Sequence, residues 1–210
     1  MLQQVEYSKY LGVLIDAKLT WQPHIDYVFN KVLKFTSIFY KISCKLQIDI
    51  LKMIYFAFVY PYLLYAVEIY GNTYQTHLNR LMVLNNKILR ILQRAPRNTP
   101  VINLYSKFNT LTLPSLHSFQ ILKFVHKFIH HCDQLPPVFS AYFSKNSMFH
   151  SYDTRNKDNL HLQLSQTNLG QRSIKFKGSS LWNTLPDVIR NTPSINAFNR
   201  KLREYLISNN

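Results

Sequence analysis

Glycine, cysteine and acidic residues are all scarce in this chain of 210 residues. Its four glycines leave long stretches without a flexible residue, which favours helices over a sheet protein with many turns. Two cysteines, Cys44 and Cys132, cannot build a disulfide framework, so a reducing, intracellular location is the expectation. The first residues lack the basic start and apolar run of an export signal. The ten acidic residues include no adjacent pair, so the sequence predicts no carboxylate cluster of the kind that a two-metal site needs.

Apolar and basic residues are abundant instead. Apolar types make up 47% of the chain and charged types 17%, a composition that excludes a disordered tail or a coiled coil. The net charge of +15 points to an anionic partner such as nucleic acid. The most membrane-like stretch, residues 53–67, would extend about 22 Å as a helix, against a hydrocarbon core of roughly 30 Å. Pro61 also interrupts it, so no membrane-spanning segment is predicted.

The spacing of apolar residues predicts a mainly α-helical fold. The predicted helices cover residues 23–43, 48–70 with a bend near Pro61, 76–93, 114–132 and a final stretch that begins after Ser194, with a short helix after Pro186. Residues 10–16 form a short apolar run that predicts one buried strand. The alternating apolar and basic residues 173–177 predict a second strand with one wet face, which would make the C-terminal segment a small α+β unit.

Breaks in this pattern divide the chain into four predicted regions. Two prolines within residues 95–100 indicate a linker, and the polar residues 144–171 indicate a loop or extended segment. The regions are a strand region over 1–20, a helical bundle over 21–95, a linker and helix over 96–143, and a C-terminal segment over 144–210.

Basic residues form a stripe on each of two predicted helices. Each stripe spans an arc of about 80° opposite the apolar arc. The first stripe contains Lys31, Lys34, Lys41 and Lys45, and the second contains Arg80, Lys87, Arg90 and Arg94. Aligned side by side, two such helices would form a groove wall that suits a phosphate backbone. Any solvated helix face of so basic a protein would also be basic, so both interpretations stay open.

Further candidates lie outside these helices. Arg155, Arg172, Lys175 and Lys177 are candidate phosphate contacts in the C-terminal segment, although Arg155 could equally be a turn charge. His126 and His130 stand four residues apart and could share a zinc ion, but no further ligand pair has suitable spacing, so the sequence predicts no metal or cofactor. Trp21 and Trp182 could stack nucleic-acid bases or pack in the core.

Taken together, a series of motifs resembles the region that follows the catalytic palm in reverse transcriptases of non-LTR (LINE-type, jockey-like) retrotransposons. In the first half the motifs are Tyr10-Leu11-Gly12-Val13, Leu19-Thr20-Trp21, His24-Ile25, Tyr60-Pro61-Tyr62-Leu63-Leu64-Tyr65-Ala66 and Glu68-Ile69-Tyr70-Gly71. In the second half they are His150-Ser151-Tyr152-Asp153-Thr154-Arg155, Gly170-Gln171-Arg172-Ser173-Ile174, Gly178, Leu181-Trp182-Asn183-Thr184-Leu185-Pro186 and the helix from Phe198 to Leu206. The motifs extend over nearly the whole chain.

The resemblance implies that residues 1–20 border a palm domain and that the helices up to about residue 93 form a thumb, which holds template and primer. The basic stripes would then follow the backbone of an RNA–DNA hybrid or of RNA. In this family the catalytic aspartates, which use a divalent metal such as Mg²⁺, lie upstream of the resembling region, so the chain is expected to be a non-catalytic fragment of an RNA-directed DNA polymerase. Two alternatives stay open: a helical protein-interaction module, and a membrane-surface protein that uses the basic stripes.

Overall fold

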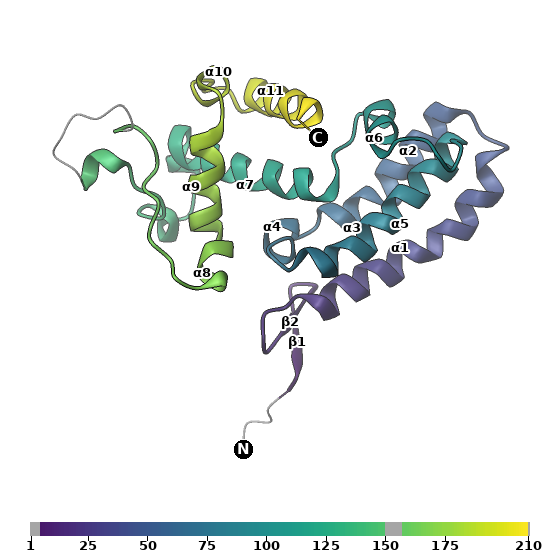
Figure 1. Cartoon of the computed structure of the whole chain (residues 1–210), viewed down its shortest axis with the longest axis horizontal. Helices are drawn as coiled ribbons and strands as arrows, with labels where there is room; N and C mark the ends of the chain where they lie inside the picture. Colours follow the sequence, from purple (N-terminus) through teal and green to yellow (C-terminus); the bar gives the residue numbers. More distant parts are fainter. Residues whose placement is uncertain (1–4, 150–156, 210) are drawn as a thin grey trace. The chain divides into compact units, whose positions relative to one another are not determined.

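A computed structural model of the chain describes residues 5–149 and 157–209 (Figure 1). The chain forms two compact units, Met1–Leu116 and His117–Asn209. The described part is mainly α-helical, and its one sheet has two strands, so the predicted fold class is confirmed. None of the described helices is both long enough and apolar enough to cross a lipid bilayer.

The first unit opens with a β-hairpin rather than one strand. Strands β1 (Tyr7–Tyr10) and β2 (Val13–Asp16) pair antiparallel, with Tyr10 opposite Val13. Between them Leu11 and Gly12 have φ values of 45° and 83°, which is the positive-φ pair that a tight two-residue hairpin turn requires. The single strand predicted over residues 10–16 was therefore wrong at its start, because the chain reverses at Gly12.

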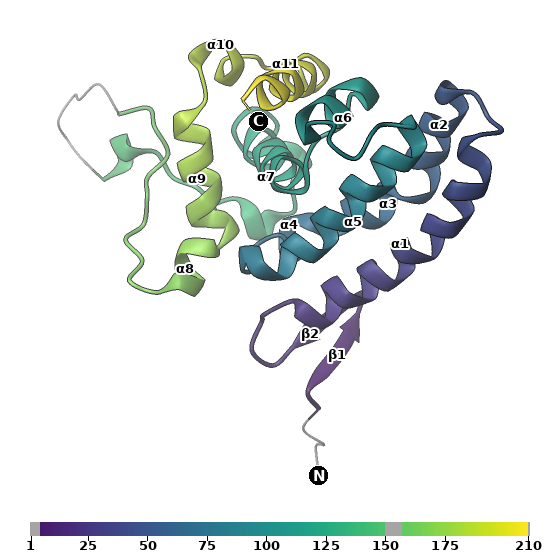
Figure 2. The ribbon, with the colours of Figure 1, turned by 45° about the vertical axis from the view of Figure 1, so that its right-hand side comes forward.

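Two long helices follow the hairpin and lie side by side (Figure 2). Helix α1 (Gln22–Ser43) and helix α5 (Gln75–Gln93) match the predicted helices over 23–43 and 76–93 to within a residue. The helix predicted over 48–70 is instead three helices, α2 (Ile48–Phe58), α3 (Tyr60–Leu64) and α4 (Val67–Tyr70). Pro61 cannot continue a helix from α2, and Ala66, at φ 58°, turns the chain before α4.

The core of the first unit contains a polar network as well as apolar side chains. The Tyr55 hydroxyl donates to Oδ1 of Asn85 at 3.2 Å, and Nδ2 of Asn85 donates to the Tyr105 hydroxyl at 2.9 Å. Burial raises the pKa of Tyr55 above its ordinary value and that of Tyr105 to about 12. Tyr105 belongs to helix α6 (Val101–Phe108), which the sequence reading placed in no element.

The second unit is built on most of helix α7 (Leu113–His130) and on α8 (Asn168–Arg172), α9 (Ile174–Thr184), α10 (Asp187–Arg190) and α11 (Ile195–Ser208). Three short 3₁₀ helices lie between α7 and α8: η1 (Cys132–Gln134), η2 (Pro137–Phe139) and η3 (Asn146–Met148). The His126 ring stacks on Phe198 with ring centroids 4.0 Å apart, and Trp182 is buried nearby. Trp182 is therefore a core residue, which removes it as a base-stacking candidate.

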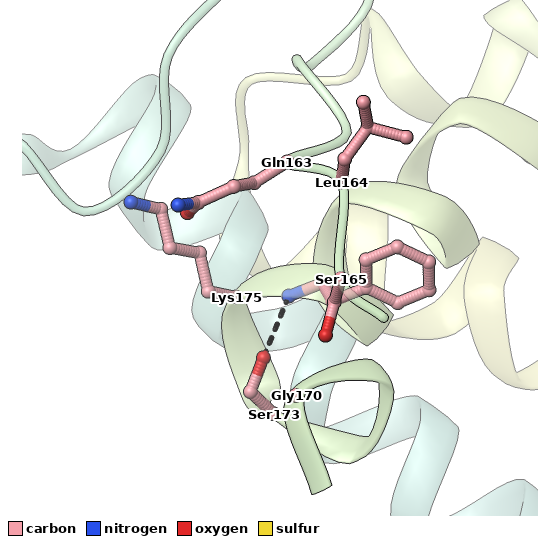
Figure 3. Close-up of a pocket in the computed structure, with 7 residues that line it drawn as sticks. Gln163, Leu164, Ser165, Gly170, Ser173 and Lys175 are labelled. Atoms are coloured by element: carbon pink, nitrogen blue, oxygen red, sulfur yellow. Dashed lines mark hydrogen bonds between the residues drawn. The ribbon is translucent and has the colours of Figure 1, made fainter. Parts of the chain in front are cut away.

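The strand predicted over residues 173–177 was wrong, because these residues form the start of α9. The Ser173 hydroxyl accepts the Phe176 N–H at 3.2 Å and so caps the helix (Figure 3). Gly178 and Trp182, four residues apart, are both buried, which is helical spacing. Residues 173–177 alternate between apolar and basic types, as in a strand. The cap at Ser173 and the burial of one face of α9 nevertheless stabilise a helix here.

Candidate nucleic-acid interface

The packing of α1 against α5 determines where the predicted basic stripes lie. The two helices run in the same direction, since Arg80 pairs with Asp26 near their first turns and Arg94 contacts Ser43 at their last turns. The Arg80 guanidinium lies 2.8 Å from the Asp26 carboxylate and 4.0 Å from the centre of the Phe29 ring. Arg80 is therefore already paired with an anion and an aromatic face.

A cleft of about 750 Å³ opens where α1 and α5 end. We call it the α1–α5 cleft. Its lining residues are Tyr40, Ser43, Cys44, Val83, Lys87, Arg90, Ile91, Arg94, Ala95 and Arg97. Four of these side chains are cationic and none is acidic, so a strong positive potential is expected within the cleft. An exposed tyrosine, Tyr40, adds an aromatic wall from α1.

Two of the four cations also hold the unit together. Arg94 ends α5 in the left-handed conformation, at φ 51°, and its guanidinium donates to the carbonyls of Ser43 and Leu46, both at 2.7 Å. These carbonyls lie at and just beyond the end of α1, where a cation is favoured by the helix dipole. The Arg90 guanidinium donates to the carbonyl of Thr99, nine residues further along the chain, at 3.4 Å. Lys87 and Arg97 are exposed, which leaves their charges accessible to a ligand.

The α1 stripe does not join the α5 stripe in one groove. None of Lys31, Lys34, Lys41 and Lys45 is among the described residues that line the α1–α5 cleft. Lys41 follows the cleft residue Tyr40 by one position, which turns it about 100° further around α1, and Lys45 lies two residues beyond the end of α1. Lys34, Lys41 and Lys45 are exposed, and the Lys31 ammonium lies 5.4 Å from the centre of the Tyr27 ring. The α1 lysines thus form a separate basic face.

In the second unit, the described cations among those predicted line two different pockets. Lys175 lines a pocket of about 210 Å³ with Gln163, Ser165 and Gly170 (Figure 3). Arg172 and Lys177 line a different pocket, of about 410 Å³.

Lys177 is half-buried and lies beside a histidine. Its ammonium lies 3.2 Å from Nδ1 of His117, and burial, with Arg172 nearby, lowers its pKa. Arg155 lies outside the residues that the structure describes.

The histidine cluster predicted as a weak zinc candidate serves another purpose. The ring nitrogens Nε2 of His126, His130 and His131 lie 2.7, 3.0 and 2.8 Å from the carbonyls of Thr192, Arg190 and Pro193. The three rings therefore fasten the segment after α10 onto the end of α7. In the described part of the chain, no group of three His, Cys, Asp or Glu side chains could hold a metal ion.

Sequence reasoning missed Tyr40 and Arg97 as cleft residues. Arg97 lies in the proline-rich stretch that was interpreted only as a linker, and Tyr40 lies outside the basic arc of α1. One signal in the sequence could have identified Arg97 as a cleft residue: it is the next basic residue after Arg90 and Arg94 in the chain.

Fold and site together define a mainly α-helical chain with a cleft lined by cations. Comparison with known proteins adds relatives. The chain is 35% identical over 99 residues to the RNA-directed DNA polymerase from mobile element jockey of Drosophila funebris, a match that covers 46% of this chain and 11% of that protein. The polymerase of the same name from Drosophila melanogaster is 33% identical over 99 residues, 46% of this chain and 11% of that protein. The probable RNA-directed DNA polymerase from transposon BS of Drosophila melanogaster is 25% identical over 116 residues, 54% of this chain and 13% of that protein.

The resemblance to jockey-like reverse transcriptases is thereby confirmed over about half of the chain. The chain spans only 11–13% of the length of these curated relatives. No family model matches the chain, and no solved structure matches it.

Proposed function

We propose that this chain corresponds to the thumb and tail that follow the palm of a retrotransposon RNA-directed DNA polymerase, and that the α1–α5 cleft binds the sugar–phosphate backbone of template and primer. The observation that carries the proposal is the lining of the cleft, with four cations and no acidic residue. Such a surface binds phosphates by charge and releases counterions, so it needs no base-specific contact. The named relatives, which are RNA-directed DNA polymerases, support nucleic acid as the partner.

The other predicted cations are proposed as secondary contacts. Lys34, Lys41 and Lys45 would attract the duplex from the separate basic face of α1, and Arg172 and Lys175 would do so from the second unit. Salt screens a charge that lies more than about 10 Å from a phosphate, so any of these residues at such a distance would contribute less than the cleft.

Polymerisation itself is not assigned to this chain. RNA-directed DNA synthesis uses a divalent ion held by converging carboxylates. The described residues do not fit such an ion, since they contain no cluster of candidate ligands. We therefore expect the chain to bind nucleic acid without extending a primer.

Charge reversal tests the proposed interface. The double variant Lys87→Glu/Arg97→Glu removes the two accessible cations of the cleft, and Lys34→Glu/Lys41→Glu makes the same charge change on the basic face of α1. Fluorescence anisotropy with a labelled RNA–DNA hybrid at low salt should show a loss of affinity of at least about tenfold for the cleft variant and a smaller loss for the α1 variant. Equal losses would mean that only net charge matters, and the cleft would then not be the interface.

The hairpin favours one second candidate, a protein-interaction module. At its tip Tyr10 is 64% exposed and Leu11 74% exposed, whereas Val13 is buried. In the proposed polymerase this apolar tip would pack on the palm domain. If the chain is instead an interaction module, sedimentation should show a defined dimer that nucleic acid does not alter and that Leu11→Lys disrupts.

A further inference from the structure

The tetrapeptide Arg-Asn-Thr-Pro occurs twice in the chain, at residues 97–100 and 190–193. In the whole sequence no other threonine, and no serine, directly precedes a proline. Proline-directed protein kinases phosphorylate a hydroxyl in this position, so the sequence offers them two candidate acceptors, Thr99 and Thr192. Because the two local sequences are identical, only the fold can distinguish them.

The fold makes Thr192 inaccessible. The residue is buried, with 8% of its surface exposed. Its hydroxyl donates to the Val188 carbonyl at 2.9 Å and accepts from the Lys201 ammonium at 3.0 Å. Nε2 of His126 lies 2.7 Å from the Thr192 carbonyl. A kinase would have to break all of these contacts to reach the hydroxyl.

The other copy lies in the exposed connection between α5 and α6. Residues 96–98 and 100–103 are exposed, and Thr99 itself is half-buried. In the described part of the chain, the Thr99 hydroxyl has no hydrogen-bond partner and is not among the buried polar atoms. The proline that follows restricts Thr99 to extended conformations, and Pro100 is itself extended, at φ −55° and ψ 137°. The Thr99 hydroxyl is therefore accessible to a kinase.

Two arginines of the α1–α5 cleft lie beside Thr99. The Arg90 guanidinium is 3.4 Å from the Thr99 carbonyl, and Arg97 precedes Thr99 by two residues. Thr99 also lies one residue before the N-cap of α6, at the positive end of that helix dipole. A phosphate placed at a helix N-terminus or opposite arginines forms new charge-assisted hydrogen bonds. The surroundings of Thr99 would therefore stabilise a phosphate.

We propose that Thr99 is a phosphorylation site and that its phosphate weakens the binding of nucleic acid in the α1–α5 cleft. The kinase would transfer the γ-phosphoryl group of ATP: Oγ1 of Thr99 attacks the phosphorus, ADP leaves, and the hydroxyl proton passes to a base of the kinase. The phosphate carries a charge of about −1.5 to −2 at pH 7 and would pair with Arg90 and Arg97, so the four lining cations would lose about half of their net charge. The inference rests on the proposed function and adds its regulation.

Site mapping tests the modification without nucleic acid. The full chain is incubated with ATP and a mitogen-activated protein kinase, which is proline-directed, and the phosphorylated residues are identified by mass spectrometry. We expect phosphate on Thr99 and none on Thr192. Peptides of residues 94–103 and 187–196 are the control, and both should be phosphorylated because they share the motif but lack the fold. If Thr99 stays unmodified in the folded chain, or if Thr192 reacts as readily, the proposed site is wrong.

Hybrid binding tests the regulation. Fluorescence anisotropy at low salt should show about tenfold weaker binding of a labelled RNA–DNA hybrid to the phosphorylated chain than to the unmodified chain. Thr99→Ala, treated with the same kinase, should bind like the unmodified chain. Thr99→Glu adds one negative charge and should cause a smaller loss than the phosphate.

Thr76→Glu is the matched control for Thr99→Glu. It adds the same charge at an exposed position near the start of α5, about 21 Å along the helix from Arg90. Salt screens a charge beyond about 10 Å, so Thr76→Glu should leave hybrid affinity nearly unchanged. Circular dichroism confirms that each variant is folded.

Two binding results overturn the regulation: phosphorylation of Thr99 that leaves hybrid affinity unchanged, or equal losses for Thr99→Glu and Thr76→Glu. Failure of the proposed function has a different signature. In that case the unmodified chain would show no salt-dependent binding of the hybrid, whatever the mapping of Thr99 shows.

Discussion

The most specific energetic consequence of the structure concerns Arg94. Its guanidinium is the donor for two carbonyls at the end of α1, those of Ser43 and Leu46, each at 2.7 Å. Hydrogen bonds of charged groups contribute about 1.5–3 kcal/mol each. Because Arg94 is an exposed residue, solvent screening reduces this, and we expect Arg94→Ala to lower the free energy of unfolding of the first unit by about 2 kcal/mol in total.

The backbone of Arg94 makes the prediction sharper. At φ 51° this residue occupies the left-handed region, where glycine is preferred by about 1 kcal/mol over a residue with a Cβ. Arg94→Gly removes the same two hydrogen bonds but relieves this strain. We therefore expect wild type to be the most stable, Arg94→Gly intermediate and Arg94→Ala the least stable.

Each unit contains one of the two tryptophans, which makes the assay specific. In a Trp182→Phe background, Trp21 fluorescence during urea unfolding reports the first unit alone. If Arg94→Ala left the Trp21 transition unchanged, or if Arg94→Gly were less stable than Arg94→Ala, the capping role of Arg94 would be refuted.

Three further predictions concern the two cores. Gly178→Ala places a Cβ 3.0 Å from Cγ2 of the buried Val125. Overpacking should cost about 2 kcal/mol, and the helix preference of alanine over glycine should return roughly 1 kcal/mol of this. Urea unfolding should therefore show a lower free energy of unfolding for the second unit. Burial lowers the pKa of His126 below 6.5, so the unfolded chain binds this proton more readily; Trp182 fluorescence should show full stability of the second unit above about pH 6.5 and a decline as pH falls below it. Asn85→Leu leaves the Tyr55 hydroxyl without its acceptor and should cost about 2 kcal/mol in the first unit, whereas Asn85→Leu with Tyr55→Phe should recover part of this loss.

The long helices could be predicted from sequence because their apolar residues repeat over many turns. Helices α1 and α5 each bury one face along their whole length, so the repeat is unambiguous and their ends were placed within a residue. Helix α6 has only two turns and begins directly after Pro100, so the two prolines before it, Pro96 and Pro100, indicated a linker rather than a helix start. The start of α9 was mistaken for a strand because a run as short as residues 173–177 fits both the two-residue repeat of a strand and the 3.6-residue repeat of a helix.

The candidate site was predictable only in part. The sequence shows that Lys87, Arg90 and Arg94 share the solvent face of one helix, and the structure places all three in the α1–α5 cleft. It cannot show which neighbouring element lies beside that face, and for this reason the capping role of Arg94 was not predicted. The structure also places His24 and Tyr62 at one pocket of about 320 Å³, a long-range neighbourhood that has no local signature in the sequence.

The central claim, that the α1–α5 cleft binds a phosphate backbone, is tested most directly by the salt dependence of hybrid binding. Each phosphate contact contributes about −0.9 to the slope of the logarithm of the association constant against the logarithm of salt concentration, so Lys87 and Arg97 together should contribute about −1.8. Lys87→Glu/Arg97→Glu should make this slope shallower by about 2, and Lys34→Glu/Lys41→Glu should change it less. A wild-type slope near zero, or identical slopes for the two double variants, would contradict the account.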